Sequence, residues 1–186
     1  MEGKAHWSTD PAPMPAEDHP DAWLGRRTAD WIGAYEGDSP FFLWVGFPGP
    51  HDPWDAPQEY VDLYSGKEIP LPETLEPPVP GGNSFDGMLD AVADYGSSAT
   101  ADLDTIREVR RHYYAGVSMI DESIGLIVDQ LRRRGMLENT WVVYTSDHGE
   151  MLGTTASSPR RCSMNPRSGF RSSCALRAGR RHGPSA

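Results

Sequence analysis

Long apolar segments are absent from this sequence of 186 residues. No run approaches the roughly 20 consecutive apolar residues of a membrane-spanning helix, so we expect no membrane partner. The segment from Met1 to Trp7 lacks the apolar stretch of a secretory signal peptide, which predicts a cytoplasmic location. Cysteine is also scarce: Cys162 and Cys174 are the two present, and both lie near the C-terminal end. They are too few for a disulfide framework.

Acidic residues are absent from residues 154–186, which carry seven arginines. Residues 1–153 have the opposite balance, with 27 acidic against 10 basic side chains. A strongly acidic body argues against nucleic acid as a partner and is compatible with a divalent cation. The sequence is therefore divided into an acidic body, residues 1–153, and a basic tail, residues 154–186. The tail needs a separate explanation.

Glycine and proline are abundant, with 19 and 17 residues, which predicts many loops. The hydrophobic content of 38% nevertheless argues against a fully disordered chain. Residues 1–20, rich in Pro, Asp and Glu, are predicted to be a flexible start. Residues 65–100 are expected to form a long surface excursion of the kind that often crosses an active site.

Apolar residues at helical spacing predict two helices. The first covers residues 21–35 and ends near Gly33 or Gly37. The second covers residues 104–135, where apolar side chains step by three or four along one face. Those side chains are Ile106, Val109, Tyr113, Val117, Ile120, Ile124, Val128 and Leu131.

Two short apolar runs, residues 41–47 and 139–145, predict strands buried on both faces of a sheet. Strand, long connection, helix and strand in this order indicate an α/β domain with a parallel sheet. Because ligands bind at the carboxyl ends of such strands, the polar loops after the two runs are expected to share one edge.

These loops hold the candidate functional residues. Asp147 and His148 offer a carboxylate and an imidazole to one metal ion, although Asp147 could instead cap a helix that begins at Glu150. His51, among prolines, could donate a proton or bind an anion, or be a solvated surface histidine.

Two segments resemble the sulfatase family of the alkaline phosphatase superfamily, which includes arylsulfatases and phosphonate monoester hydrolases. One is Phe41-Phe-Leu-Trp-Val-Gly-Phe-Pro-Gly-Pro-His-Asp-Pro-Trp-Asp-Ala-Pro57. The other runs from Tyr113-Tyr-Ala-Gly-Val-Ser-Met-Ile-Asp-Glu-Ser-Ile-Gly125 to a strand followed by Ser146-Asp-His-Gly-Glu150. The resemblance implies an alkaline-phosphatase-like fold: a mixed, mostly parallel sheet flanked by helices, incomplete in this chain. Residues 21–153 would be part of a catalytic domain.

The resemblance also implies roles for the matching residues. His51 corresponds to the family's catalytic histidine, which contacts the sulfuryl oxygens and assists departure of the leaving alcohol. Asp147 corresponds to a metal-binding carboxylate, and His148 to a second ligand or a substrate contact. Calcium is the usual ion, and manganese, magnesium or zinc are alternatives. The substrate would be a small-molecule sulfate ester, or a phosphate or phosphonate ester.

The family's nucleophile, a formylglycine made from cysteine in a Cys-x-Pro-x-Arg motif or sometimes from serine there, has no counterpart here. Cys162 is followed by Ser-Met-Asn and Cys174 by Ala-Leu-Arg. The covalent mechanism cannot proceed without a nucleophile. We therefore expect these residues to be the central fragment of a sulfatase and to be inactive as they stand.

The basic tail, residues 154–186, departs from the family pattern. Back-translation with one base restored after Gly153 allows a family-like continuation, so we expect a frameshifted and disordered tail. The alternative is a genuine Arg-rich arm on a non-catalytic acidic module, binding an anionic partner.

Overall fold

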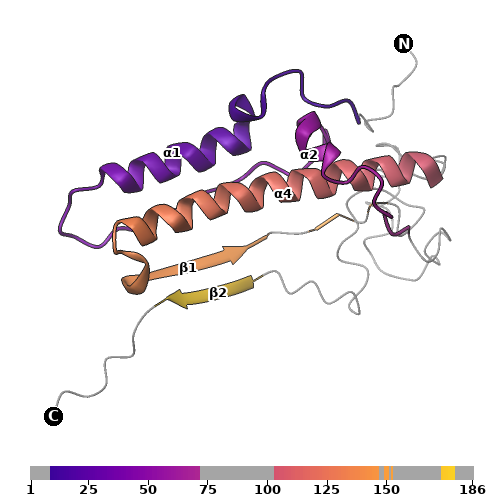
Figure 1. The fold of residues 1–186 in the computed structure, drawn as a ribbon. Coiled ribbons are helices and arrows are strands. Elements are labelled where there is room, and N and C mark those ends of the chain that lie inside the picture. Colours follow the sequence, from indigo (N-terminus) through magenta and orange to yellow (C-terminus); the bar gives the residue numbers. More distant parts are fainter. Residues whose placement is uncertain (1–8, 72–102, 147–148, 151, 153–172, 179–186) are drawn as a thin grey trace, which may run out of the picture.

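The computed structural model describes residues 9–71, 103–146, 149–150, 152 and 173–178. In Figure 1, α1 lies above the long helix α4, and β1 and β2 lie below it. The elements in chain order are η1 (Ala16–Asp18), α1 (Pro20–Ala34), α2 (Gln58–Asp62), α4 (Leu103–Arg133), η3 (Leu137–Asn139), β1 (Thr140–Thr145) and β2 (Ser173–Ala178).

The long helix predicted over residues 104–135 is confirmed as α4. Four of the eight predicted face residues are buried, namely Ile106, Val109, Ile120 and Leu131, whereas Val117 is 43% exposed. The helix ends at a glycine: Gly135 has a φ of 66°, a conformation that side chains disfavour. The Gly135 amide donates to Arg132 O and the Met136 amide to Leu131 O, which satisfies two carbonyls of the last turn.

The predicted helix over residues 21–35 is also confirmed, as α1. It packs along α4 with unusually close contact at Gly25, where an added Cβ would lie 2.6 Å from Ser123 Cβ. A second close approach joins Gly33 to Gln130, so the two helices run in the same direction. Because neither glycine carries a side chain, the helix backbones can lie near each other.

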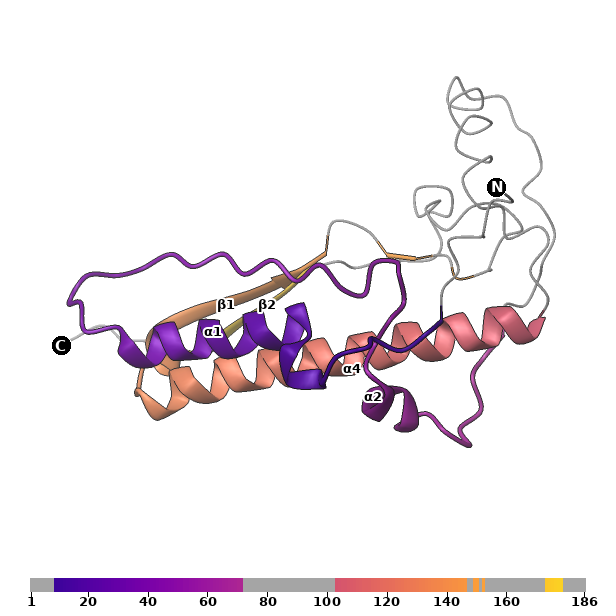
Figure 2. The same ribbon diagram turned by 90° about the horizontal axis from the view of Figure 1, so that it is seen from above.

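After α1 the chain returns in an extended conformation, which Figure 2 shows running back along the helix. The prediction of a buried strand at residues 41–47 is wrong for this structure. Phe42 is 88% and Trp44 74% exposed, and no described residue pairs with the segment in a sheet. Phe41 instead packs edge-on against the rings of Trp31 and Tyr35, with centroids 5.2 and 5.1 Å away.

The predicted strand at residues 139–145 is confirmed as β1, but its burial is not: Trp141 is 62% and Val143 64% exposed. β1 pairs antiparallel with β2, from Thr140↔Ala178 to Thr145↔Ser173. Among the described residues this pair is the sheet, and the expected parallel sheet is not seen there.

Parts of the predicted flexible start and of the predicted tail are among the described residues. In the flexible start, residues 9–20 have defined contacts: the Ala12 amide donates to Asp55 O at 2.8 Å, and His19 is buried. In the tail, Ser173–Ala178 forms the strand β2. Residues 1–8, 154–172 and 179–186, and most of the surface excursion, lie outside the described residues.

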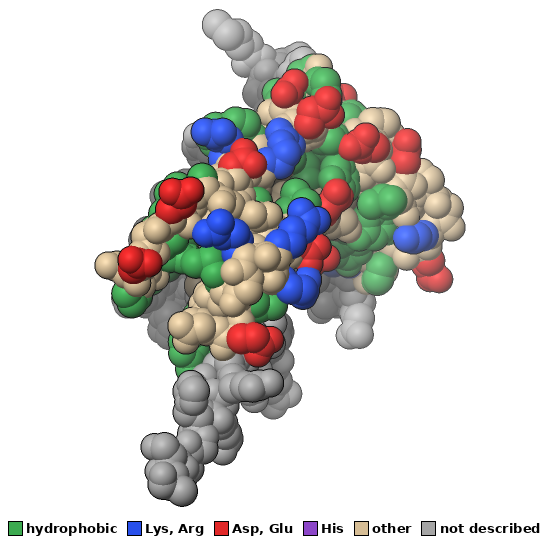
Figure 3. Space-filling view, turned by 60° about the vertical axis from the view of Figure 1, so that its left-hand side comes forward, with side chains coloured by type: hydrophobic (Ala, Val, Ile, Leu, Met, Phe, Trp, Pro, Cys, Tyr) green, Lys and Arg blue, Asp and Glu red, His purple; other side chains and the backbone are tan. Residues whose placement is uncertain are grey.

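The face in Figure 3 carries Lys and Arg side chains interspersed with Asp and Glu. Exposed pairs three residues apart on a helix, such as Arg27 with Asp30 at 3.6 Å, contribute at most about 1 kcal/mol each. Stability therefore depends on helix packing rather than on these pairs. No helix of the described residues is long and apolar enough to cross a bilayer.

We expect Gly25→Ala to lower the free energy of unfolding by about 1–3 kcal/mol, because the new methyl group must displace Ser123. Gly125→Ala is the matched control, since an added Cβ there meets no atom within 4 Å. That variant should gain about 0.5–1 kcal/mol from helix propensity. Urea unfolding measures both changes. Equal effects of the two substitutions would contradict the close contact between α1 and α4.

Candidate functional site

His51 lies in the loop that follows the extended segment. The loop begins with a turn in which the His51 amide donates weakly to Pro48 O at 3.4 Å. The peptide bonds before Pro50 and Pro53 are cis. The predicted catalytic histidine thus lies on a short, proline-rich turn.

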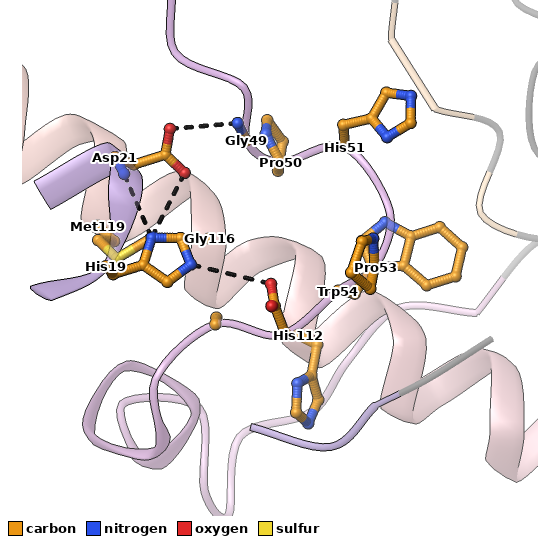
Figure 4. A pocket seen from close by; sticks show the side chains of 12 residues that line it. His19, Asp21, Gly49, Pro50, His51, Pro53, Trp54, His112, Gly116 and Met119 are labelled. Carbon is orange, nitrogen blue, oxygen red and sulfur yellow. Dashed lines mark hydrogen bonds and ion pairs between the residues drawn. The ribbon is translucent and has the colours of Figure 1, made fainter. Parts of the chain in front are cut away.

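The imidazole of His51 is oriented by the next residue. Its Nδ1 lies 2.9 Å from Asp52 Oδ1 and 2.6 Å from the Asp52 carbonyl oxygen. Both are acceptors, so Nδ1 carries a proton and Nε2 is on the opposite side of the ring. The side chain is 45% exposed, and in Figure 4 the ring points away from His19 and Asp21.

A buried carboxylate lies on the other side of this loop. Asp21, at the start of α1, is 2% exposed, and its Oδ1 accepts from the Gly49 amide at 3.2 Å. Burial raises the pKa of the Asp21 carboxyl, while the Gly49 hydrogen bond and the nearby His19 oppose that shift. The negative charge of Asp55 also raises the pKa of Asp21, by less than burial does. The ionised form of Asp21 therefore lacks the solvation by water that it has in the unfolded chain.

His19 joins Asp21 to Asp55. Its Nδ1 accepts from the Asp21 amide at 3.3 Å and so caps α1. The His19 Nε2 lies 3.8 Å from Asp55 Oδ1, on the side of the ring away from the Asp21 amide. Figure 4 shows His19 beside Asp21 in this pocket, which Asp55 also lines.

His112 of α4 completes the wall of this pocket. Burial is the main reason why the pKa of His112 lies below its ordinary value. Its Nδ1 has no hydrogen-bond partner among the described residues. The cavity volume is about 20 Å³, just enough for one water molecule. The pocket is therefore too small for an ester substrate.

Arg110 of α4 forms a hydrogen bond to Leu152, which follows the candidate metal ligands Asp147 and His148 in the sequence. Its Nε donates to Leu152 O at 2.9 Å, and its Nη1 donates to Pro70 O. The guanidinium is buried, and burial lowers its pKa. The segment just after the candidate metal loop is thus attached to the long helix.

The predicted metal ligands Asp147 and His148 lie outside the described residues, so their closeness to His51 stays a prediction. Within the described part of the chain, no group of three or more His, Cys, Asp or Glu side chains could hold a metal ion. His51 and Asp21 line the same pocket without contact between their side chains, and the sequence analysis did not single out Asp21.

A family model described as Sulfatase matches residues 4–177. The chain is similar to a choline-sulfatase of Rhizobium meliloti (strain 1021), with 35% identity over 118 residues, 63% of this chain and 23% of the relative. It is also similar to the multifunctional alkaline phosphatase superfamily protein PehA of Trinickia caryophylli, with 29% identity over 159 residues, 77% of this chain and 30% of the relative.

Among solved structures, the phosphonate monoester hydrolase SpPMH from Silicibacter pomeroyi matches with a TM-score of 0.63 and 25% identity. The match covers 84% of this chain and 35% of that structure. The chain therefore spans roughly a quarter to a third of the length of the proteins that it matches.

We expect Asp21→Asn to be more stable than the unmodified chain at neutral pH, because the amide keeps an acceptor for Gly49 without a buried charge. The folded-state pKa of Asp21 is raised, so protonation stabilises the fold fully below the unfolded value of 3.8. This stabilisation by protonation is lost as the pH rises through the folded-state pKa of Asp21. The difference between the two proteins should therefore grow from about pH 4 upward.

Urea unfolding from pH 3 to pH 7 measures this difference. The exposed carboxylate of Asp30, on the same helix, provides the control Asp30→Asn, which should change stability by less than about 0.5 kcal/mol. A difference for Asp21→Asn that shrinks as the pH rises would contradict the sign of the shift.

Proposed function

Because this chain belongs to the sulfatase family, we propose that it serves the hydrolysis of small-molecule sulfate esters, with His51 as a catalytic residue. The observation that carries the proposal is the geometry of His51: a partly exposed imidazole whose Nδ1 is held by Asp52 on a proline-rich turn. A protonated ring held in this way presents Nε2–H to an anionic oxygen. In that position it would bind the sulfuryl group and protonate the leaving alcohol.

The choice of ester has a second candidate, a phosphonate or phosphate ester. It is supported by the likeness to SpPMH, titled a phosphonate monoester hydrolase, and by the matching protein PehA, described as multifunctional. Both ester classes present anionic oxygens to a cationic donor, so the geometry of His51 suits either.

Sulfate binding to the 186-residue chain tests the role of His51. NMR signals of the His51 ring should move on titration with inorganic sulfate, and less with sodium chloride at equal ionic strength. The rings of His19 and His112 are the internal controls, because both are buried. A parallel titration with methylphosphonate compares the two ester classes. Identical shifts with sulfate and chloride would refute an anion site at His51.

The nucleophile is a separate matter. Neither cysteine stands in a Cys-x-Pro-x-Arg motif, so we propose that these 186 residues alone are inactive and correspond to part of a catalytic domain. The purified chain should therefore release no measurable product from an aryl sulfate, because no covalent intermediate can form. Turnover that His51→Ala abolishes would overturn this prediction and require a different mechanism.

We further propose Asp147 and His148 as ligands of a divalent metal, with calcium first and manganese, magnesium or zinc as alternatives. Such an ion would supply positive charge beside the ester oxygens. Hard divalent ions prefer six or more oxygen ligands, and two side chains on one loop leave most positions to water.

We therefore expect the 186-residue chain to bind calcium, manganese or zinc with a dissociation constant of roughly 1 mM or weaker. Calorimetric titration measures this constant, and a thermal melt should change little with metal. Micromolar binding that Asp147→Ala abolishes would show that other residues of this chain complete the site.

The frameshift in residues 154–186 stays a hypothesis, and two observations weigh against it. The family match extends to residue 177, and Ser173–Ala178 pairs with β1. The genomic DNA across these codons decides the question. A missing base after the codon for Gly153 would restore the hypothesis.

A further inference from the structure

We propose that Asp21 is a positioning residue for His51: its buried carboxylate holds the Pro48–His51 turn through the amide of Gly49. The inference rests on the proposed role of His51 and adds to it the residue that fixes where this histidine stands. Asp21 does not contact the His51 ring, which points away from it in Figure 4. It would therefore act through the backbone of the turn.

The hydrogen bond from Gly49 to Asp21 connects positions 28 residues apart, with 3.2 Å between N and Oδ1. The bond is partly buried, and a carboxylate is a stronger acceptor for this amide than a carbonyl or water. Because Gly49 precedes His51 by two residues, fixing its amide limits the directions in which the histidine can project.

The turn is also pressed closely against both helices. A Cβ on Gly49 would meet the Asp21 carboxylate and would lie 3.3 Å from Ile120 Cδ1 of α4. A Cβ on Gly116 of α4 would lie 3.3 Å from Pro50 Cβ. Two glycines, one in the turn and one in the helix, thus allow this approach, and the turn has little room to shift.

Asp21 itself is held from both sides. Its amide donates to His19 Nδ1, and its carbonyl accepts from Ser123 Oγ at 3.4 Å. A side chain can position another group only if its own backbone is fixed. Asp21 meets this condition because it lies where α1, α4 and the turn come together.

The test compares three variants of the 186-residue chain. Asp21→Ala removes the acceptor, Asp21→Asn keeps an oxygen for Gly49, and Ile32→Val trims a buried side chain three turns along α1. The readouts are hydrogen exchange of the Gly49 amide and the NMR signals of the His51 ring. Asp21→Ala should raise the exchange rate about tenfold and move the His51 signals. Asp21→Asn should restore both, and Ile32→Val should leave both unchanged.

Gly49→Ala tests the same contact from the turn, and it should move the His51 signals even if Asp21→Ala does not fold. The proposal is overturned if Asp21→Ala or Gly49→Ala leaves the His51 signals in place, or if Ile32→Val moves them equally. Sulfate titration of the unmodified chain is a separate arm. If sulfate leaves His51 unaffected while the variants behave as expected, the anion role fails and the positioning role stands.

Discussion

The close packing of α1 against α4 is the constraint on which the rest of the described structure depends. Gly25 lets the two helices approach until Ser123 touches the opposite backbone. The same approach brings the first turn of α1 over α4, so that Ser123 Oγ reaches Asp21 O. Without that approach, the Asp21 carboxylate would not be buried beside the turn that carries His51. The packing of α1 against α4 therefore also determines where His51 is placed.

The helices could be predicted from sequence because their signals are local. The spacing of Ile106, Val109 and Ile120 already indicates the buried face of α4. The strand at residues 140–145 has the same local character, being rich in β-branched and aromatic residues. Such patterns report what a segment would prefer to bury, and they do not report what covers it. This explains why residues 41–47 are extended but exposed.

The cluster around Asp21 could not be found in this way. A cap is sought among Ser, Thr, Asp and Asn, whereas α1 is capped by His19, which precedes a proline. The decisive bond depends on Gly49, 28 residues away, and neither residue carries a local signal of the pairing. β2 was missed for a related reason, since Ser173–Ala178 contains no β-branched residue and no clear alternation. Its pairing with β1 is what makes it a strand.

Arg110 fixes the separation between two segments of the chain. One guanidinium donates to the carbonyls of Pro70 and Leu152, which belong to segments far apart in the sequence. The guanidinium is planar, and its N–H groups diverge at fixed angles. The distance between the two carbonyl groups is therefore set by the covalent geometry of one side chain. A lysine at this position would keep the charge and lose the spacing.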